Sequence, residues 1–169
     1  RPMISGAAIS AFLRECAGRQ EWSLKGWYDP ARGTDALLQA DPRYQQLPTA
    51  PGARYLREQK LRQEAQRGLR RLTGEIAARV AEGLTEACER LRALQALPGC
   101  ASGRSEEVAS HHAVLLRPAQ LPALRVAAER VGAEFAAYGL RLELSGPWPL
   151  YSFCPALAPA EAVSTEPQP

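Results

Sequence analysis

The sequence predicts an α+β fold in which a long helix, or a pair of helices, packs on a C-terminal βαβ unit. Three patterns predict this class. Apolar and charged residues alternate over residues 140–144, which is the period of a strand with one buried face. A strand pattern over residues 108–117 and a helix pattern over residues 120–138 come directly before it. Apolar residues also recur at helical spacing through residues 53–96.

The first thirty residues read as a helix followed by a strand, a partial α+β subdomain. Apolar side chains at helical spacing predict a short amphipathic helix over residues 3–17, and Gly18 stands at the position of a C-terminal cap. In residues 21–29, Trp22 and Leu24 alternate with polar residues, and Asp29 followed by proline closes the run. This pattern predicts a strand.

Residues 30–52 are rich in Pro, Gly, Ala and Gln and show little periodicity. We expect mostly a linker, with at most a turn of helix over residues 35–39 capped by Thr34 or Asp35. A boundary is expected near residues 48–52. The predicted division is therefore an N-terminal part over residues 1–48, a C-terminal part over residues 49–154, and a tail over residues 155–169.

The stretch from residue 53 to residue 96 is predicted to be helical. Its apolar stripe steps by threes and fours, and consists of Leu69, Leu72, Ile76, Val80, Leu84, Cys88 and Leu91. Three glycines interrupt it, Gly68, Gly74 and Gly83, and each costs about 1 kcal/mol relative to alanine in a helix. We therefore expect either two helices or one helix that bends, ended by Pro98.

The C-terminal half is predicted to form the βαβ (ferredoxin-like) unit. Strand 108–117 leads through two prolines into helix 120–138, which ends at Gly139 and returns as strand 140–145. The two strands should be parallel, with a right-handed crossover. Residues beyond 155 are polar and acidic, which predicts a disordered tail.

An aromatic segment follows the last predicted strand. Gly146, Pro147 and Pro149 prevent it from continuing as a central strand, and three aromatics follow, Trp148, Tyr151 and Phe153. Each aromatic side chain buries roughly 150–250 Å² when covered. Two interpretations remain open: the segment packs on the core of this chain, or part of it receives a partner.

Composition excludes several classes of function. The net charge of +3 is too small to imply a polyanionic partner, and no stretch reaches the ~18–20 apolar residues of a membrane span. The four cysteines form no Cys-x-x-Cys pair, which favours reduced thiols in a soluble, cytoplasmic protein. His111 and His112 are neighbours in a predicted strand, so they point to opposite faces and do not share a metal. We expect no catalytic, metal or cofactor site.

Basic residues gather at the start of the long helix, over residues 54–71. Three interpretations remain open for this cluster: a solvated helix face, docking to an acidic or amphipathic protein, or phosphate binding in a nucleic-acid-binding module. Its members are Arg54, Arg57, Lys60, Arg62, Arg67, Arg70 and Arg71.

Residues 146–153 read Gly-Pro-Trp-Pro-Leu-Tyr-Ser-Phe. They resemble the Gly-Pro-Trp-Pro-Pro-Tyr-Ser-Phe signature of the gas vesicle protein F/L family, with Leu150 in place of a proline and Ser152 conforming to the pattern. Residues 21–25 are similar to the family's Glu-Trp-Gly-x-Lys strand, with Ser23 in place of glycine, and residues 52–56 to its Ala-Gly-x-x-Tyr-Leu helix start.

The resemblance implies a non-enzymatic accessory or minor structural protein of gas vesicle formation. Such a protein is expected to bind the small hydrophobic (GvpA-like) shell protein during assembly and to localise to the cytoplasm and the vesicle. Other gas vesicle accessory proteins are further candidate partners. Expected contacts are the long helix and exposed members of the set Trp22, Trp27, Tyr28 and Tyr151. In the family, strands earlier in the sequence accompany strand 21–29. If such strands are missing here, strand 21–29 is expected to lack partners and to expose an edge.

Overall fold

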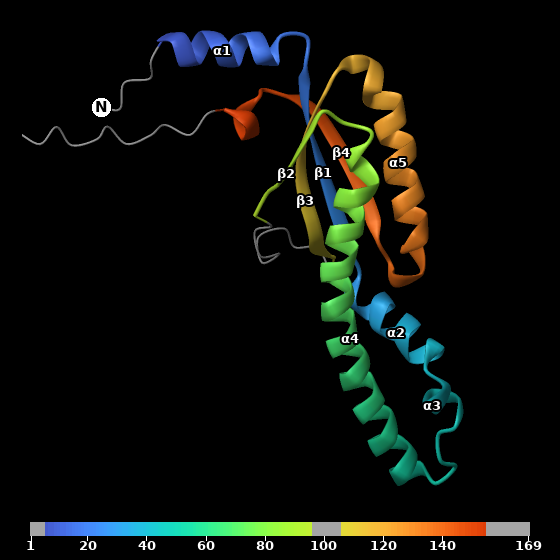
Figure 1. The fold of residues 1–169 in the computed structure, drawn as a ribbon. Coiled ribbons are helices and arrows are strands. Elements are labelled where there is room, and N and C mark those ends of the chain that lie inside the picture. Colours follow the sequence, from blue (N-terminus) through green and yellow to red (C-terminus); the bar gives the residue numbers. More distant parts are fainter. Residues whose placement is uncertain (1–5, 96–105, 155–169) are drawn as a thin grey trace, which may run out of the picture.

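The computed structural model describes residues 6–95 and 106–154, with side chains from residue 10 onward (Figure 1). Helices cover one face of a four-stranded sheet, and one long helix projects beyond it. The helices are α1 (Gly6–Cys16), α2 (Pro30–Ala40), α3 (Pro42–Gln45), α4 (Pro51–Thr85) and α5 (Leu121–Glu134). The strands are β1 (Gln20–Tyr28), β2 (Arg90–Ala93), β3 (Glu107–Leu116) and β4 (Arg141–Trp148). Short 3-10 turns within the described residues are η2 (Pro118–Gln120), η3 (Ala136–Tyr138) and η4 (Tyr151–Phe153).

Strand β1 lies in the middle of the sheet, whose order is β2-β3-β1-β4. It pairs antiparallel with β3 on one side and with β4 on the other; Leu24, for example, lies opposite both His112 and Leu144. Since both neighbours run against β1, β3 and β4 are parallel to each other, and the predicted βαβ unit is confirmed with β1 inserted between its strands. The expectation that residues 21–29 lack strand partners is wrong, because the returning chain supplies both.

The sheet thus combines strands from both sides of the predicted boundary near residue 48; the boundary itself stays a prediction. Strand β4 continues to Trp148, beyond the predicted end at residue 145. It does so at the edge of the described sheet, where Pro147 need not donate to a second neighbour. Helix α5 ends at Glu134, a 3-10 turn follows, and Gly139 has a φ of 78°, as its predicted role at the helix end requires.

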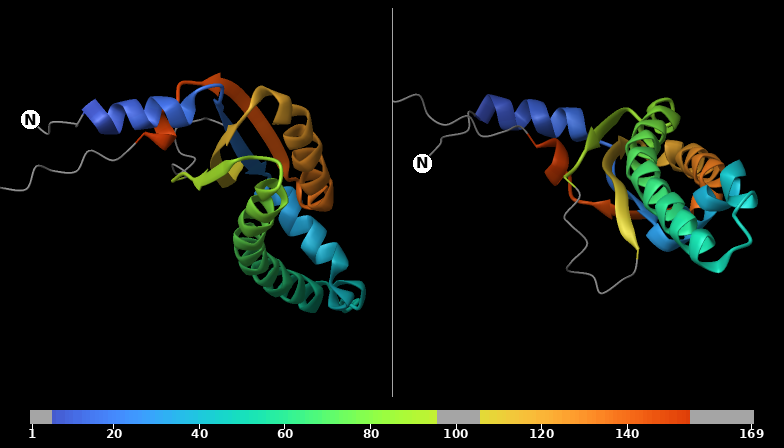
Figure 2. Two further views of the ribbon diagram at one scale, coloured as in Figure 1. Left: turned by 45° about the horizontal axis from the view of Figure 1, so that its top comes forward. Right: turned by 90° about the horizontal axis from the view of Figure 1, so that it is seen from below.

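Helix α4 is a single continuous element of 35 residues, ~52 Å long at 1.5 Å per residue, and it curves gently (Figure 2). It ends at Thr85, so the predicted helix end near residue 96 is wrong. The spacing of Cys88 and Leu91 continues the helical stripe, yet Leu91 belongs to β2 and lies opposite Val114. A short strand can also direct one apolar side chain toward the core. The spacing of apolar residues therefore does not distinguish a helix from a strand at this position.

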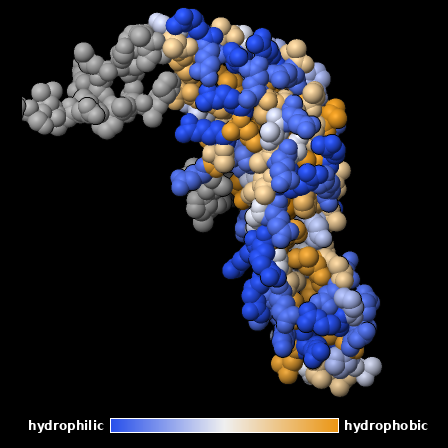
Figure 3. Space-filling model, in the orientation of Figure 1, coloured by the Kyte–Doolittle hydropathy of each residue, from blue (hydrophilic) through white to orange (hydrophobic). Residues whose placement is uncertain are grey.

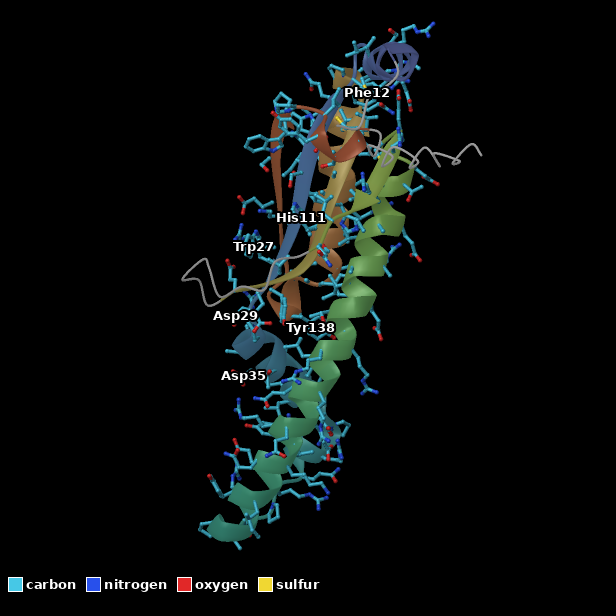
Figure 4. The ribbon with its side chains drawn as sticks, turned by 90° about the vertical axis from the view of Figure 1, so that its left-hand side faces the viewer. Phe12, Trp27, Asp29, Asp35, His111 and Tyr138 are labelled. Atoms are coloured by element: carbon cyan, nitrogen blue, oxygen red, sulfur yellow. The ribbon has the colours of Figure 1, made fainter. Side chains whose placement is uncertain are left out.

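The expectation of a linker over residues 30–52 is also wrong, because α2 and α3 occupy most of it. The side chain of Asp29 accepts hydrogen bonds from the amides of Ala31 and Arg32 at 2.9 and 3.2 Å, and Pro30 fills the first helical position. Asp29 is thus a helix N-cap, whereas the sequence pattern favoured Thr34 or Asp35. Figure 4 shows Asp29 at the start of α2.

The main core lies between the sheet and helices α4 and α5. The predicted stripe on α4 is confirmed there, with Ile76, Val80 and Leu84 buried in this core. Leu69 is also buried, but outside this cluster and beside Gly33 of α2. A smaller cluster on the opposite face of the sheet consists of Ala113, Leu115 and Phe153.

Two glycines of α4 give a matched test of how closely the helices pack. A Cβ at Gly83 would lie 2.5 Å from Cγ2 of the fully buried Val131 on α5, whereas a Cβ at Gly74 meets no heavy atom within 4 Å. Overpacking costs ~1–3 kcal/mol, and alanine gains ~1 kcal/mol over glycine in a helix. In urea denaturation, Gly83→Ala should therefore lower the free energy of unfolding by about 1 kcal/mol, and Gly74→Ala should raise it by a similar amount. Equal effects would contradict the close approach of α4 to α5.

Candidate functional site

The Gly-Pro-Trp-Pro segment begins with a glycine that no other residue can replace without strain. Gly146 has a φ of 148°, which favours glycine. A Cβ at this position would also lie 3.0 Å from the indole ring of Trp22 and 3.1 Å from the carbonyl oxygen of Glu21. The peptide bond between Gly146 and Pro147 is cis. Two of the segments that resemble the family, residues 21–25 and 146–153, therefore lie directly against each other.

A buried carboxylate joins these two segments. Glu21 is only 6 % exposed. Its two carboxylate oxygens accept hydrogen bonds from Ser152, one from the backbone amide at 3.0 Å and one from the hydroxyl at 2.6 Å. Glu21 thus fixes the backbone at the end of the C-terminal motif, although the two residues are far apart in the sequence.

The end of the motif is anchored on the face of the sheet that lies away from α4 and α5. Phe153 is 5 % exposed and packs with Ala113 and Leu115. The guanidinium of Arg90 lies 5.3 Å from the centre of its ring, and Arg92 donates a hydrogen bond to the carbonyl oxygen of Ser152. Strand β2, which the sequence did not predict, supplies both arginines.

Two other aromatics of the motif face solvent. Trp148 is 54 % exposed and Tyr151 is 78 % exposed. The indole of Trp148 donates to the hydroxyl of Ser145 at 3.4 Å. Strand pairing becomes irregular between Glu21 and Ser23, which changes the alternation that would otherwise turn Trp148 toward the helices along with Leu144. Strand periodicity alone could not have predicted this exposure.

The other predicted contact residues are buried. Trp22 is 7 % exposed and lies beneath the guanidinium of Arg125. The indole of Trp27 donates to Glu143 at 3.1 Å, and the hydroxyl of Tyr28 donates to Glu107 at 2.6 Å. Burial and this glutamate raise the pKa of Tyr28 to about 12. Of the four predicted contact residues, only Tyr151 is exposed. Trp148, which belongs to the same motif, is a second exposed aromatic residue.

The two histidines lie on opposite faces of the sheet, as the strand pattern predicts. His111, labelled in Figure 4, has its Nε2 atom 3.0 Å from the hydroxyl of Ser23. His112 is buried on the face that the helices cover, and burial lowers the pKa of both imidazoles. Within residues 6–95 and 106–154, no three His, Cys, Asp or Glu side chains are grouped so that they could hold a metal ion. None of the described helices is both long and apolar enough to cross a membrane.

The predicted basic cluster lies on the first half of α4, far from the C-terminal motif (Figure 1). One of its arginines is already ion-paired, since Nη1 of Arg62 lies 3.0 Å from Oδ1 of Asp35 on α2. Arg67 and Arg71 are exposed.

Solved structures that share this fold include two of gas vesicle proteins. The gas vesicle protein GvpF from an Anabaena species matches with a TM-score of 0.61 and 14 % identity, covering 88 % of this chain and 59 % of that one. GvpF from Microcystis aeruginosa matches with a TM-score of 0.56 and 17 % identity, covering 88 % and 60 %. The chain therefore spans about three fifths of the length of these structures. No curated protein matches it.

A family model described as "Gas vesicle synthesis protein GvpL/GvpF" matches residues 5–155. This match includes β1, the long helix and the whole C-terminal motif. The chain therefore belongs to the GvpL/GvpF family of gas vesicle synthesis proteins.

Proposed function

We propose that this chain is a non-enzymatic accessory or minor structural protein of gas vesicle formation, which binds the hydrophobic shell protein during assembly. Family membership supports a role related to gas vesicles. The observation that carries the proposal is the exposure of Trp148 and Tyr151, at 54 % and 78 %, on a backbone that Glu21 and Gly146 hold in place.

Rigid aromatic side chains suit this task. A shell subunit that excludes water needs its apolar surface covered before assembly, and exposed aromatics on a fixed backbone can cover it with little loss of conformational entropy. Binding of this kind requires no reacting group. The polar side chain of the motif agrees with this, because Ser152 already donates its hydrogen bonds to Glu21 of the same chain.

The test is capture of the candidate shell protein by immobilised chain. The Trp148→Ala/Tyr151→Ala double variant should capture about one tenth as much shell protein as the wild type, or less. The reason is that aromatic residues are the most frequent binding hot spots. Val126→Ala is the matched control, since Val126 is 65 % exposed on α5 and lies outside the motif. Undiminished capture by the double variant would contradict the proposal.

The alternative, a nucleic-acid-binding module using residues 54–71, has no support from the family or the related structures. The same capture experiment addresses it. Phosphate binding weakens steeply as salt rises, whereas apolar docking does not, so capture should persist at high salt.

A further inference from the structure

The first half of α4 extends beyond the sheet, and α2 and α3 run beside it (Figures 1 and 2). We call this projection, residues 30–71, the arm. An open groove of about 820 Å³ lies between its helices. The apolar residues that line it are Leu37 and Leu38 on α2 and Leu61, Ala65 and Gly68 on α4. Figure 3 shows hydrophobic residues at the surface where α2 meets α4, bordered by hydrophilic ones.

A glycine leaves room in the floor of this groove. A Cβ at Gly68 would lie 3.7 Å from Cδ1 of Leu37, which is an ordinary van der Waals distance. The position thus has space for a side chain that the sequence does not supply. Glycine is a poor residue for the interior of a helix, so stability of α4 does not account for its presence.

The charged residues that line the groove differ in how far they are neutralised. Arg43 is held by two carboxylates, with its Nη2 atom 2.7 Å from Asp41 and 2.8 Å from Glu64. Arg67 and Arg71 lie one helical turn apart on α4 and are both exposed. Neither forms an ion pair within the described part of the chain. An occupant of the groove therefore meets positive charge at Arg67 and Arg71, whereas the charge of Arg43 is already neutralised within the chain.

This combination specifies the chemistry of the occupant. We propose that the groove binds an amphipathic helix of a partner protein, with a leucine-type stripe in the groove and acidic side chains facing Arg67 and Arg71. The walls are helices and offer no strand edge, so an extended peptide would leave its backbone groups unpaired, whereas a helix satisfies its own. A third helix would complete a three-helix arrangement with α2 and α4. This surface is separate from Trp148 and Tyr151, so the inference does not rest on the proposed function.

The probe is a synthetic, fluorescein-labelled helical peptide with leucines at positions i, i+3, i+4 and i+7 and glutamates along one flank, measured by fluorescence anisotropy. Gly68→Leu fills the groove and should weaken binding by at least about tenfold, as loss of an apolar anchor does. The same variant should unfold at an equal or higher temperature, because leucine is the better helix former. A loss of binding without a loss of stability separates a blocked groove from a damaged fold.

Charge reversal provides a second, independent variant. Arg67→Glu/Arg71→Glu should weaken binding of the glutamate-flanked peptide by several-fold and should favour a lysine-flanked peptide instead. Arg57→Glu is the matched control, since Arg57 is exposed on the same helix but does not line the groove.

Four outcomes would overturn the inference. Equal binding of wild type and Gly68→Leu would place the peptide elsewhere, as would equal affinity for a peptide with its leucines dispersed. Displacement of the peptide by a single-stranded oligonucleotide, with no effect of Gly68→Leu on oligonucleotide binding, would indicate that Arg67 and Arg71 bind phosphate instead. Self-association in light scattering that Gly68→Leu abolishes would make a second copy of this chain the occupant.

Discussion

Ile76→Ala is expected to lower the free energy of unfolding by about 2–5 kcal/mol, as removal of a large aliphatic side chain from a core does. Ile76 is 0 % exposed and belongs to the main cluster between α4 and the sheet. Truncation removes its contacts with neighbours on both layers, and the surrounding elements can only partly close the cavity. Urea denaturation followed by circular dichroism measures the change.

Val126→Ala is the control for this substitution. Val126 is also β-branched and helical, but its side chain is 65 % exposed, so the expected change lies within about 0.5 kcal/mol. The comparison isolates burial from helix propensity. If both variants lost the same small amount of stability, α4 would not be packed on the sheet as described.

Local periodicity accounts for most of the elements that the sequence predicts. The alternation around Leu24 and Leu144 and the stripe through Ile76 each reflect one buried face, and the structure buries those faces together. Periodicity does not reveal which strands are neighbours. Strand β1 pairs with residues at least 79 positions away, and no pattern within residues 20–28 indicates those partners.

The predictions that the structure contradicts also have local causes. Asp29 followed by proline is typical both of a strand end and of a helix N-cap, and the structure shows that it is both. In the candidate site, the motif itself is visible in the sequence, but the division into buried and exposed aromatics is not. Trp22 is buried on the same face of β1 as Leu24, whereas Trp148 is exposed because the pairing irregularity beside Glu21 changes the face that its side chain occupies. Only the tertiary structure fixes that.

The contact between Glu21 and Ser152 leads to the second large prediction. Glu21→Ala should lower the free energy of unfolding by about 2–4 kcal/mol, since it removes two hydrogen bonds to a buried charged acceptor. The amide and the hydroxyl of Ser152 would lose their acceptor in a part-buried position. The segment that carries Trp148 and Tyr151 would then be held less firmly, so capture of the shell protein should fall even though both aromatics remain.

A double-mutant cycle tests whether the two motifs are physically coupled. Ser152→Ala removes only the hydroxyl and keeps the amide bond to Glu21, so its expected cost is smaller, about 1–2 kcal/mol. Once Glu21 is alanine, the hydroxyl has lost its acceptor, and removing it should cost little more; the two effects should therefore fall short of additivity by about 1 kcal/mol. Glu129→Ala, at an exposed position of α5, controls for the loss of a carboxylate. Strict additivity, with unchanged capture by Glu21→Ala, would mean that the aromatic segment keeps its conformation without this contact, because Phe153 and the arginines of β2 suffice to hold it.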